Sequence, residues 1–267
     1  MKTLPYYHVD AFASRPFTGN QAAVMPLEDW LDDTVLQAIA EENNFAETAF
    51  VVKDATGEAD WELRWFTPTE EVRLCGHATL ASGHVLLGSD GGDKVSFRTR
   101  LSGVLELRRV EKGYELALPA IPTERDEWPE AAALLGGSPI ECWRNPHGYD
   151  LFLYPDEAAI RALEPDLRGL AKLGNNLFVC TAPGTKTDIV SRVFVPGGGV
   201  DEDPVTGAAH ATLTPFWAAK LARDLFTAHQ ASRRGGTLTC RLDGDRAILS
   251  GDCVTVVEGS FYLPSAG

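Results

Sequence analysis

The spacing of hydrophobic and polar residues predicts a mixed α/β protein in which short strands alternate with a few helices. Segments rich in β-branched and aromatic residues predict strands at 6–13, 47–53, 61–68, 149–155, 175–182 and 191–198. Apolar residues at spacings of three and four predict helices at 28–44 and 156–173. Two glycine-opened segments, 76–87 and 206–222, are apolar on nearly every side, which is typical of buried helices.

The order of these segments repeats along the chain. Arg-x-Phe-x-Pro occurs at Arg64 and at Arg192, and each arginine stands fourteen residues after a phenylalanine, Phe50 or Phe178. After each motif come a loop, a glycine-opened apolar helix and a meander of short strands. The tetrapeptide His-Ala-Thr-Leu also occurs in both helices. Repeated landmarks in the same order indicate a duplicated structural unit.

The repeat predicts two pseudo-symmetric halves, each a mixed, barrel-like β-sheet wrapped around one central helix. A stretch rich in Pro and Glu after residue 118 marks the crossing between them. We therefore expect an N-terminal half at 1–118, which the last strand at about 256–267 can join, and a C-terminal half at 119–255. The active-site cleft is expected between the halves.

Charge and cysteine content narrow the class of protein. The formal charge is −14, and a field of that sign repels nucleic acid and anionic membrane surfaces. Five widely spaced cysteines without a Cys-x-x-Cys pair fit reduced thiols better than a disulfide framework or a zinc site. The N-terminal residues carry no apolar signal region, and no segment reaches about 18 consecutive apolar residues. We expect a cytoplasmic protein that binds neither nucleic acid nor membrane.

The two glycine-opened helices supply candidate chemistry, because a helix N-terminus presents free N–H groups that bind a carboxylate. Polar residues adjoin each start. The substrate-binding candidates around the two starts are Cys75, Gly76, Ala78, Thr79, Thr206, Gly207 and Ala208. His77 and Asp203 are candidate catalytic residues there. Plain structural roles stay open, since Asp203-Pro204 also fits an ordinary N-cap, Cys75 a small core residue, and both His84 and His210 simple packing.

Glu47 is the third catalytic candidate. It stands between a helix end and an apolar strand, with Phe45, Phe50 and Val51 close in sequence. A carboxyl group in apolar surroundings is suited to general acid–base catalysis, whereas the alternative is an ordinary charge in a surface loop. The sequence contains no dinucleotide fingerprint, P-loop or metal-spaced His/Cys set, so we expect no metal and no organic cofactor.

Four stretches together resemble one known family, and they occur in its expected order. They read HVDAFASRPFTGNQAAV, NNFAETAFV, RWFTPTEEVRLCGHATLASGHVL and DEDPVTGAAHATL. In these stretches the sequence is similar to the PhzF-like phenazine-biosynthesis isomerases, which are relatives of diaminopimelate epimerase. The resemblance implies two pseudo-symmetric halves with the active site between them, a homodimer, and proton transfer without metal or cofactor.

The resemblance also implies roles for individual residues. Glu47 corresponds to the family's general acid/base, Gly76-His77 to its Gly-His pair, and Asp203 to the aspartate of its DPxTG motif. Asn20 and the Gly207 region correspond to loops that hold the substrate. Ala46 and Ala208 stand where relatives carry serine, so the resemblance implies the reaction class rather than the phenazine substrate itself.

Three functions follow as hypotheses. The first is a cofactor-independent isomerase that shifts a proton on a small carboxylate, with Glu47 as acid/base. The second is an epimerase or racemase of an amino or hydroxy acid that uses Cys75 and Asp203 on opposite faces of the substrate. The third is a catalytically idle protein that binds a small carboxylate.

Overall fold

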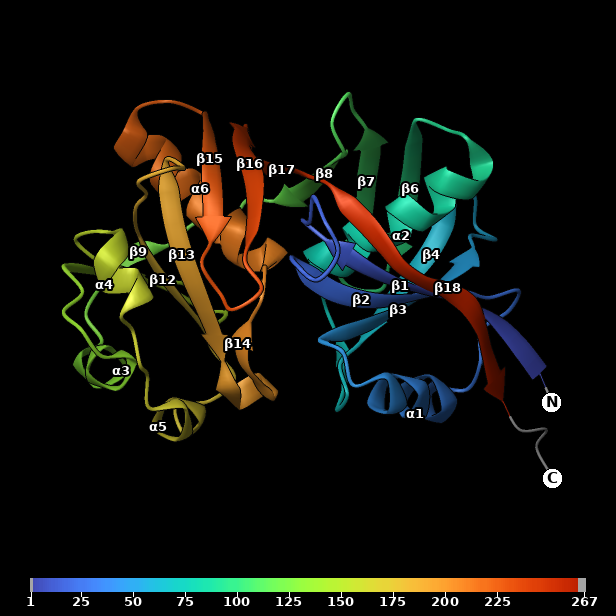
Figure 1. Cartoon of the computed structure of the whole chain (residues 1–267), viewed down its shortest axis with the longest axis horizontal. Helices are drawn as coiled ribbons and strands as arrows, with labels where there is room; N and C mark the ends of the chain where they lie inside the picture. Colours follow the sequence, from blue (N-terminus) through green and yellow to red (C-terminus); the bar gives the residue numbers. More distant parts are fainter. Residues whose placement is uncertain (1, 264–267) are drawn as a thin grey trace. The chain divides into compact units, whose positions relative to one another are not determined.

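The computed structural model describes residues 2–263, which form two compact units. Unit 1 combines the residues up to Ala117 with those from Ser250 onward, and unit 2 is the continuous segment Leu118–Leu249. The chain thus leaves unit 1 once and returns to it at the end. In Figure 1 the red final strand accordingly lies beside the blue first strand.

Unit 1 contains two helices and most of a mixed sheet. Its elements in chain order are β1 (Lys2–Ala11), β2 (Asn20–Pro26), α1 (Asp33–Asn43), β3 (Glu47–Lys53), β4 (Trp61–Phe66), β5 (Glu71–Val72), α2 (Gly76–Asp90), β6 (Lys94–Thr99), β7 (Val104–Arg109), β8 (Tyr114–Pro119, which runs to the boundary) and β18 (Cys253–Leu263).

The sheet of unit 1 curves around α2. Strand β1 lies antiparallel between β18 and β2, and β2 runs parallel to β3. The sheet continues through an antiparallel β3–β4 pair, a parallel β4–β6 pair and the antiparallel strands β7 and β8. Helix α2 packs against β1, β2, β3, β6 and β7, and Gly76–Leu87 is buried throughout except for half-buried His84. Figure 1 shows α2 enclosed by these strands.

Unit 2 repeats this plan with additional helices. Its elements are β9 (Glu124–Asp126), α3 (Pro129–Leu135), β10 (Glu141–Arg144), β11 (Tyr149–Leu153), α4 (Glu157–Arg161), α5 (Leu167–Ala171), β12 (Leu177–Pro183), β13 (Ile189–Val195), the 3-10 helix η1 (Pro196–Gly198), β14 (Val200–Asp203), α6 (Gly207–Leu221), β15 (Leu225–Gln230), β16 (Gly236–Asp243) and β17 (Arg246–Gly251, which crosses the boundary).

The strand pairing of unit 2 follows the same sequence of directions. Strands β11 and β12 are parallel, β12 and β13 antiparallel, β13 and β15 parallel, and β15 and β16 antiparallel. The central helix α6 packs against β11 and β16. Two sheets of equal plan, each with one buried helix, confirm the predicted pseudo-symmetric α/β fold.

Helix α6 continues through Pro215, which lacks the N–H that would bond to the carbonyl of Ala211. That carbonyl accepts a hydrogen bond of 3.0 Å from the N–H of Ile121 instead. The segment that leads into unit 2 therefore satisfies the one acceptor that the proline leaves open, and the buried helix is not broken.

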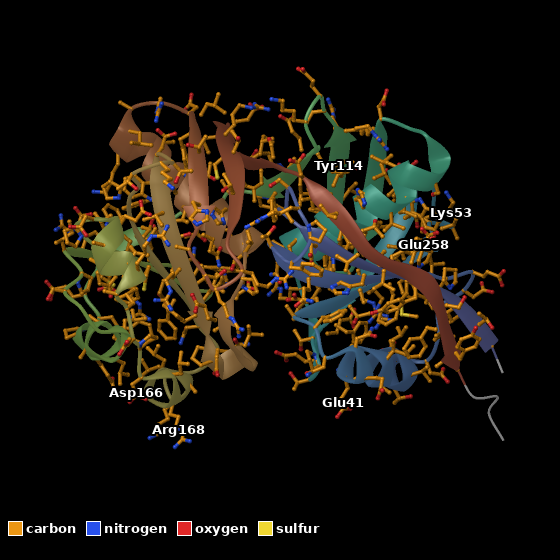
Figure 2. All side chains as sticks on the ribbon, in the orientation of Figure 1. Glu41, Lys53, Tyr114, Asp166, Arg168 and Glu258 are labelled. Carbon is orange, nitrogen blue, oxygen red and sulfur yellow. The ribbon has the colours of Figure 1, made fainter. Side chains whose placement is uncertain are left out.

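Two helix predictions differ from the structure. The segment 156–173 is not one helix but two, α4 and α5, because Pro165 disfavours helical geometry at the residue before it. Asp156 and Asp166 each cap one of the pieces, the latter by accepting from the Gly169 N–H at 3.0 Å; Asp166 is labelled in Figure 2. The helix expected at 28–44 begins only at Asp33, and the indole of Trp30 before it donates to Glu62 at 3.1 Å.

An arginine occupies the same place in each unit; Arg64 is buried and Arg192 is half-buried. Arg64 donates to both carboxylate oxygens of Glu71 at 2.8 and 2.7 Å, and Arg192 does so to Glu202 at 2.7 and 3.0 Å. Each guanidinium also lies 5.0 Å from the ring of the phenylalanine two residues later. Bidentate pairing fixes both distance and direction, so each pair joins a long strand to the short strand before the buried helix.

No helix among residues 2–263 combines the length and the apolar character needed to cross a bilayer.

The Arg64 pair leads to a stability prediction. Arg64→Met should lower the free energy of unfolding by about 2 kcal/mol, because Glu71 loses two hydrogen bonds to a buried guanidinium and keeps only the exposed Arg100. Lys94→Met removes an exposed pair with Glu106 and should cost less than about 1 kcal/mol. Urea unfolding monitored by tryptophan fluorescence measures both values, and equal losses would contradict a structural role for the buried pair.

Candidate active site

Four of the predicted site residues come together in unit 1. The Glu47 Oε2 atom, at the start of β3, lies 3.1 Å from Nε2 of His77, the second residue of α2. On the other side of the imidazole, Nδ1 lies 3.1 Å from Asn20 Nδ2 and 3.5 Å from Cys75 Sγ. The side chain of His77 is 3% exposed and that of Glu47 is 17% exposed. A buried imidazole therefore connects a partly accessible carboxylate to an amide and a thiol.

The fold explains why these four side chains meet. Strands β2 and β3 are parallel with Ala22 opposite Glu47, so Asn20 and Glu47 open neighbouring strands at the same end of the sheet. Helix α2 packs against both strands. Its N-cap, Cys75, has extended backbone geometry, which is usual where a chain enters a helix. The helix start therefore lies at the strand openings.

Burial and charge act in opposite directions on the two titrating groups beside Glu47. Burial lowers the pKa of His77, but the negative charges that Cys75 and Glu47 can carry outweigh it and raise that pKa above its usual value. Burial raises the pKa of Cys75 to about 11, so at neutral pH this group is an uncharged thiol. The carboxylate of Glu47 is therefore the charge that acts on His77 near neutrality.

The contact between Glu47 and His77 has a close distance but poor alignment. Glu47 Oε2 and His77 Nε2 are both buried, and their geometry does not meet the angular requirement of a hydrogen bond. Two buried polar atoms in this state are costly, so they are available for better partners. A substrate that aligns with either atom gains that interaction.

The remaining predicted residues of the α2 start have different surroundings. Gly76 and Ala78 are buried in the first turn, where backbone N–H groups point out of the helix end. Thr79 directs both its hydroxyl and its N–H to the carbonyl of Cys75, at 2.6 and 3.2 Å. Both hydrogen-bond donors of Thr79 are therefore used within the first turn of α2.

Glu47, Cys75 and His77 each place one potential ligand atom within 4.8 Å of the others, a spacing that would allow a metal ion to be held. Of these three groups, His77 contacts both of the others directly, as the central member of an acid–base cluster does. The expectation of a site without metal or cofactor stays a prediction.

Unit 2 brings together a second set of predicted residues around the start of α6. The Thr206 hydroxyl donates to Asp203 Oδ2 at 2.5 Å, and both side chains are buried. Gly207 opens the helix, and the following Ala208 is half-buried. Elsewhere in this unit the Asp156 carboxylate caps α4 by accepting from the Ala159 N–H, but no side-chain cap bond forms at α6. Asp203 therefore does not serve as the N-cap that its Asp-Pro sequence suggested.

One residue of this cluster, Gln230 at the end of β15, was not predicted from the sequence. Its fully buried amide accepts from the Thr206 N–H at 2.9 Å and donates to the Asp203 carbonyl at 2.6 Å. It clamps both ends of the turn between β14 and α6. Its partners lie 24 and 27 residues away, so no local pattern could reveal it.

The strand registers show which positions of the two units correspond. Arg64 and Arg192 hold equivalent ion pairs, and the next residue of each strand faces Val72 in unit 1 and Asp203 in unit 2. Val72 and Asp203 are therefore equivalent positions. Three and five residues further along, Cys75 is equivalent to Thr206 and His77 is equivalent to Ala208. Phe66 and Phe194 each stand two residues after the equivalent arginines, and they face Thr48 and Phe178 on the neighbouring strands. Glu47 is therefore equivalent to Leu177.

Among the described residues, the acid–base cluster of Glu47, Cys75 and His77 therefore occurs in unit 1 and not in unit 2. The position in unit 1 that is equivalent to Asp203 holds Val72, which has no carboxylate. The registers also correct the His-Ala-Thr-Leu repeat. His77 is the second residue of α2, but His210 is the fourth of α6, so the two copies are displaced by two positions on the helix. Likewise Phe50 faces Arg64, whereas the residue facing Arg192 is Cys180 rather than Phe178.

Comparison with known proteins identifies the family. The family described as phenazine biosynthesis-like protein matches residues 9–259. This chain belongs to that family, called PhzF. An uncharacterized isomerase of Pseudomonas aeruginosa is 46% identical over 263 residues, covering 97% of this chain and 99% of the relative.

Solved structures agree with this membership. A PhzF-family phenazine biosynthesis protein of Enterococcus faecalis superposes with a TM-score of 0.91 at 41% identity, covering 98% of this chain and 100% of that one. A hydroxyproline epimerase of Agrobacterium vitis shares the fold alone, with a TM-score of 0.62 at 12% identity over 97% of this chain and 92% of its own. Three curated relatives, 40–46% identical to this chain, are named uncharacterized isomerases, and this PhzF-family protein is an isomerase.

The two other helix histidines have structural partners, as predicted. His84 Nδ1 lies 2.9 Å from the hydroxyl of Tyr114, which Figure 2 labels, and its Nε2 lies 2.9 Å from Thr255 Oγ1. His210 is fully buried and its Nδ1 lies 2.8 Å from the Thr206 carbonyl. Burial lowers the pKa of His210 to about 4, so the ring is neutral near pH 7.

The Gln230 clamp should be visible in hydrogen exchange. Gln230→Leu leaves the Thr206 N–H and the Asp203 carbonyl without their partner, so we expect a loss of about 3 kcal/mol in the free energy of unfolding. The backbone N–H groups of residues 203 and 205–207 should also exchange faster, Pro204 having none. Gln37→Leu, which removes one amide bond to the Thr67 carbonyl in unit 1, should leave their exchange unchanged. Unaltered protection of the turn in Gln230→Leu would contradict the clamp.

His210 should make stability fall in mild acid. Its folded pKa of about 4 lies below the usual 6.5, so the unfolded chain binds the extra proton first as the pH falls from 6.5 to 4. This contribution is lost across that window and amounts to about 3 kcal/mol. Urea unfolding of His210→Gln at pH 7 and 4.5 should show a smaller loss than the parent. Exposed His147→Gln is the control, and an equal loss in His210→Gln would refute the assignment.

Proposed function

We propose that this protein catalyses a cofactor-independent proton shift on a small carboxylate, with Glu47 as general acid/base. The contact between the Glu47 carboxylate and the buried imidazole of His77 is the observation that supports it most. A carboxylate that is partly accessible, and held by a buried polar group, can accept a proton from a bound molecule and return it.

In the proposed reaction, Glu47 removes a proton from an acidic carbon of the substrate. The electron pair left by the broken C–H bond moves into the adjoining double-bond system, and Glu47 delivers the same proton to another carbon on the same face. The net change is a 1,3-type shift with no redox step. His77 orients the carboxylate of Glu47, while N–H groups at the helix start are suited to the substrate carboxylate.

Asp203 is proposed as a second functional carboxylate. The Thr206 hydroxyl and the Gln230 clamp hold it and its turn in one geometry. Ordered polar groups of this kind stabilise charge without reorganising during the reaction.

The two units carry different acid–base side chains at equivalent positions, and this difference favours a proton shift over epimerisation. A two-base epimerase needs an acid/base on each face of the substrate, and the position that corresponds to Cys75 is Thr206. The buried Cys75 thiol, whose pKa is raised to about 11, is also a weak base at neutral pH. Glu47 is thus the better placed proton acceptor of unit 1.

Exchange in D2O tests the proposal. The protein is incubated with a panel of cyclic and amino carboxylates, and C–H exchange is followed by NMR. Glu47→Gln should lower the exchange rate by about 10²- to 10⁴-fold, because it removes the base and keeps the shape. Exposed Glu58→Gln should keep the parent rate.

The outcomes separate the three functions. Exchange with double-bond migration that survives Cys75→Ala supports the proposed isomerase, and inversion that is lost in Cys75→Ala supports an epimerase. Binding without exchange for every compound supports an idle carboxylate-binding protein. Full activity of Glu47→Gln would remove Glu47 from the mechanism whichever reaction is observed.

A further inference from the structure

Asn20 contacts the imidazole of His77, in addition to the substrate contact implied by its motif. It is fully buried as the first residue of β2, and its Nδ2 lies 3.1 Å from His77 Nδ1. The preceding Gly19 has φ +67°, and a side chain there would meet the Ala11 carbonyl at 2.2 Å. A turn that only glycine fits therefore places the Asn20 amide against the imidazole.

The thiol of Cys75 approaches the same ring nitrogen. Its Sγ lies 3.5 Å from His77 Nδ1. Because burial keeps this thiol protonated at neutral pH, its S–H is a donor there. The Asn20 N–H and the Cys75 S–H thus both point toward His77 Nδ1. This nitrogen can accept their hydrogen bonds only through its lone pair.

The two donors decide where the proton of the neutral imidazole resides. A neutral imidazole carries one N–H, and a nitrogen that accepts hydrogen bonds cannot be the protonated one. The proton must then be on Nε2, the atom that lies 3.1 Å from Glu47 Oε2. An N–H this close to a carboxylate oxygen is attracted by its charge even without the alignment of a hydrogen bond, whereas two lone pairs at that distance would repel.

We propose that Asn20 is a positioning residue that holds His77 in its Nε2–H tautomer, so that the imidazole presents a proton to Glu47 and leaves Glu47 as the base. The role of Glu47 in that statement rests on the proposed function, but the tautomer itself does not. The proposal adds a role in which Asn20 acts on the reaction through His77.

The arrangement also explains what a charged His77 would require. An imidazolium has N–H at both nitrogens, and Nδ1–H would point at the Asn20 N–H and at the Cys75 thiol. The amide would have to rotate and present its oxygen instead. Glu47 favours the imidazolium by its charge, while the two donors at Nδ1 oppose it, so Asn20 sets the balance between the two states.

Nitrogen NMR of the full-length protein tests the tautomer without any substrate. In protein labelled with ¹⁵N-histidine, long-range ¹H–¹⁵N spectra are recorded while the pH is raised, because the neighbours of His77 raise its pKa and the ring becomes neutral only above it. The neutral ring should then show a protonated Nε2 and an unprotonated Nδ1. A His77→Gln variant assigns its signals among those of the six histidines. A neutral parent ring with Nδ1–H, or a ring that stays doubly protonated at every pH at which the protein is folded, would overturn the proposal.

Substitution of Asn20 provides a second test of the tautomer. Asn20→Asp places a carboxylate at Nδ1 and should move a proton onto that nitrogen, and Asn20→Leu should weaken the preference for Nε2–H. Gln21→Glu is the matched control, since the neighbouring Gln21 amide lies 3.1 Å from His8 Nε2, so it should alter the His8 signals and leave His77 unchanged. A folded Asn20→Asp with the parent tautomer would also overturn the proposal.

The two proposals fail separately. We expect Asn20→Asp to lower C–H exchange at least 10-fold with little change in KM, because it acts on the acid–base pair and not on binding. The Nε2–H tautomer together with an active Glu47→Gln would refute only the role of Glu47. An inactive Glu47→Gln together with an Nδ1–H parent spectrum would refute only the role of Asn20.

Discussion

The bidentate pairing of an arginine with a glutamate, buried in unit 1 and half-buried in unit 2, locates the start of the central helix in both units. In unit 1 the Arg64–Glu71 pair joins β4 to β5, and only four residues then separate Glu71 from the N-terminal Gly76 of α2. In unit 2 the Arg192–Glu202 pair has the same relation to Gly207. A buried guanidinium tolerates little displacement, because every donor that loses its acceptor costs free energy. Each helix start is therefore located by charge pairing as well as by packing.

This shared frame carries different chemistry in the two units. At corresponding positions, unit 1 has Glu47, Cys75 and His77, and unit 2 has Leu177, Thr206 and Ala208. Asp203 in turn takes the position of Val72. Duplication thus supplied the placement of the helix starts, and the side chains at those places determine that only one unit holds an acid–base cluster. The buried polar groups of unit 2 form a fixed network instead, with Gln230 at its centre.

Much of the fold could be predicted from the sequence because its signals are local. Strand 47–53 was predicted with its observed bounds, and the glycine openings of α2 and α6 were placed within one residue. Predictions that depended on equal spacing were less reliable. The hairpin loop between Lys53 and Trp61 is two residues longer than that between Pro183 and Ile189, so the phenylalanines at equal distance from their arginines do not correspond.

The candidate site likewise has some features that the sequence predicts and others that it does not. Glu47, His77 and Cys75 were predicted together, and the structure brings them into contact. Their detailed relation was not predictable, because it depends on which nitrogen of His77 faces which neighbour. Asn20 was predicted to touch substrate from its motif, but 57 residues separate it from the imidazole that it contacts. The broken helix at 156–173 shows a local signal, Pro165, that deserved more weight than the apolar spacing around it.

The return of β18 to β1 affects how the chain can fold during its synthesis. Ten residues of β1 pair with β18, which is the last of the described strands to be translated. Unit 2 is one uninterrupted segment, so every strand it needs has been translated before β18 emerges from the ribosome. The unit translated first is thus the one completed last, and an unpaired edge of β1 must be kept from aggregating in the interval.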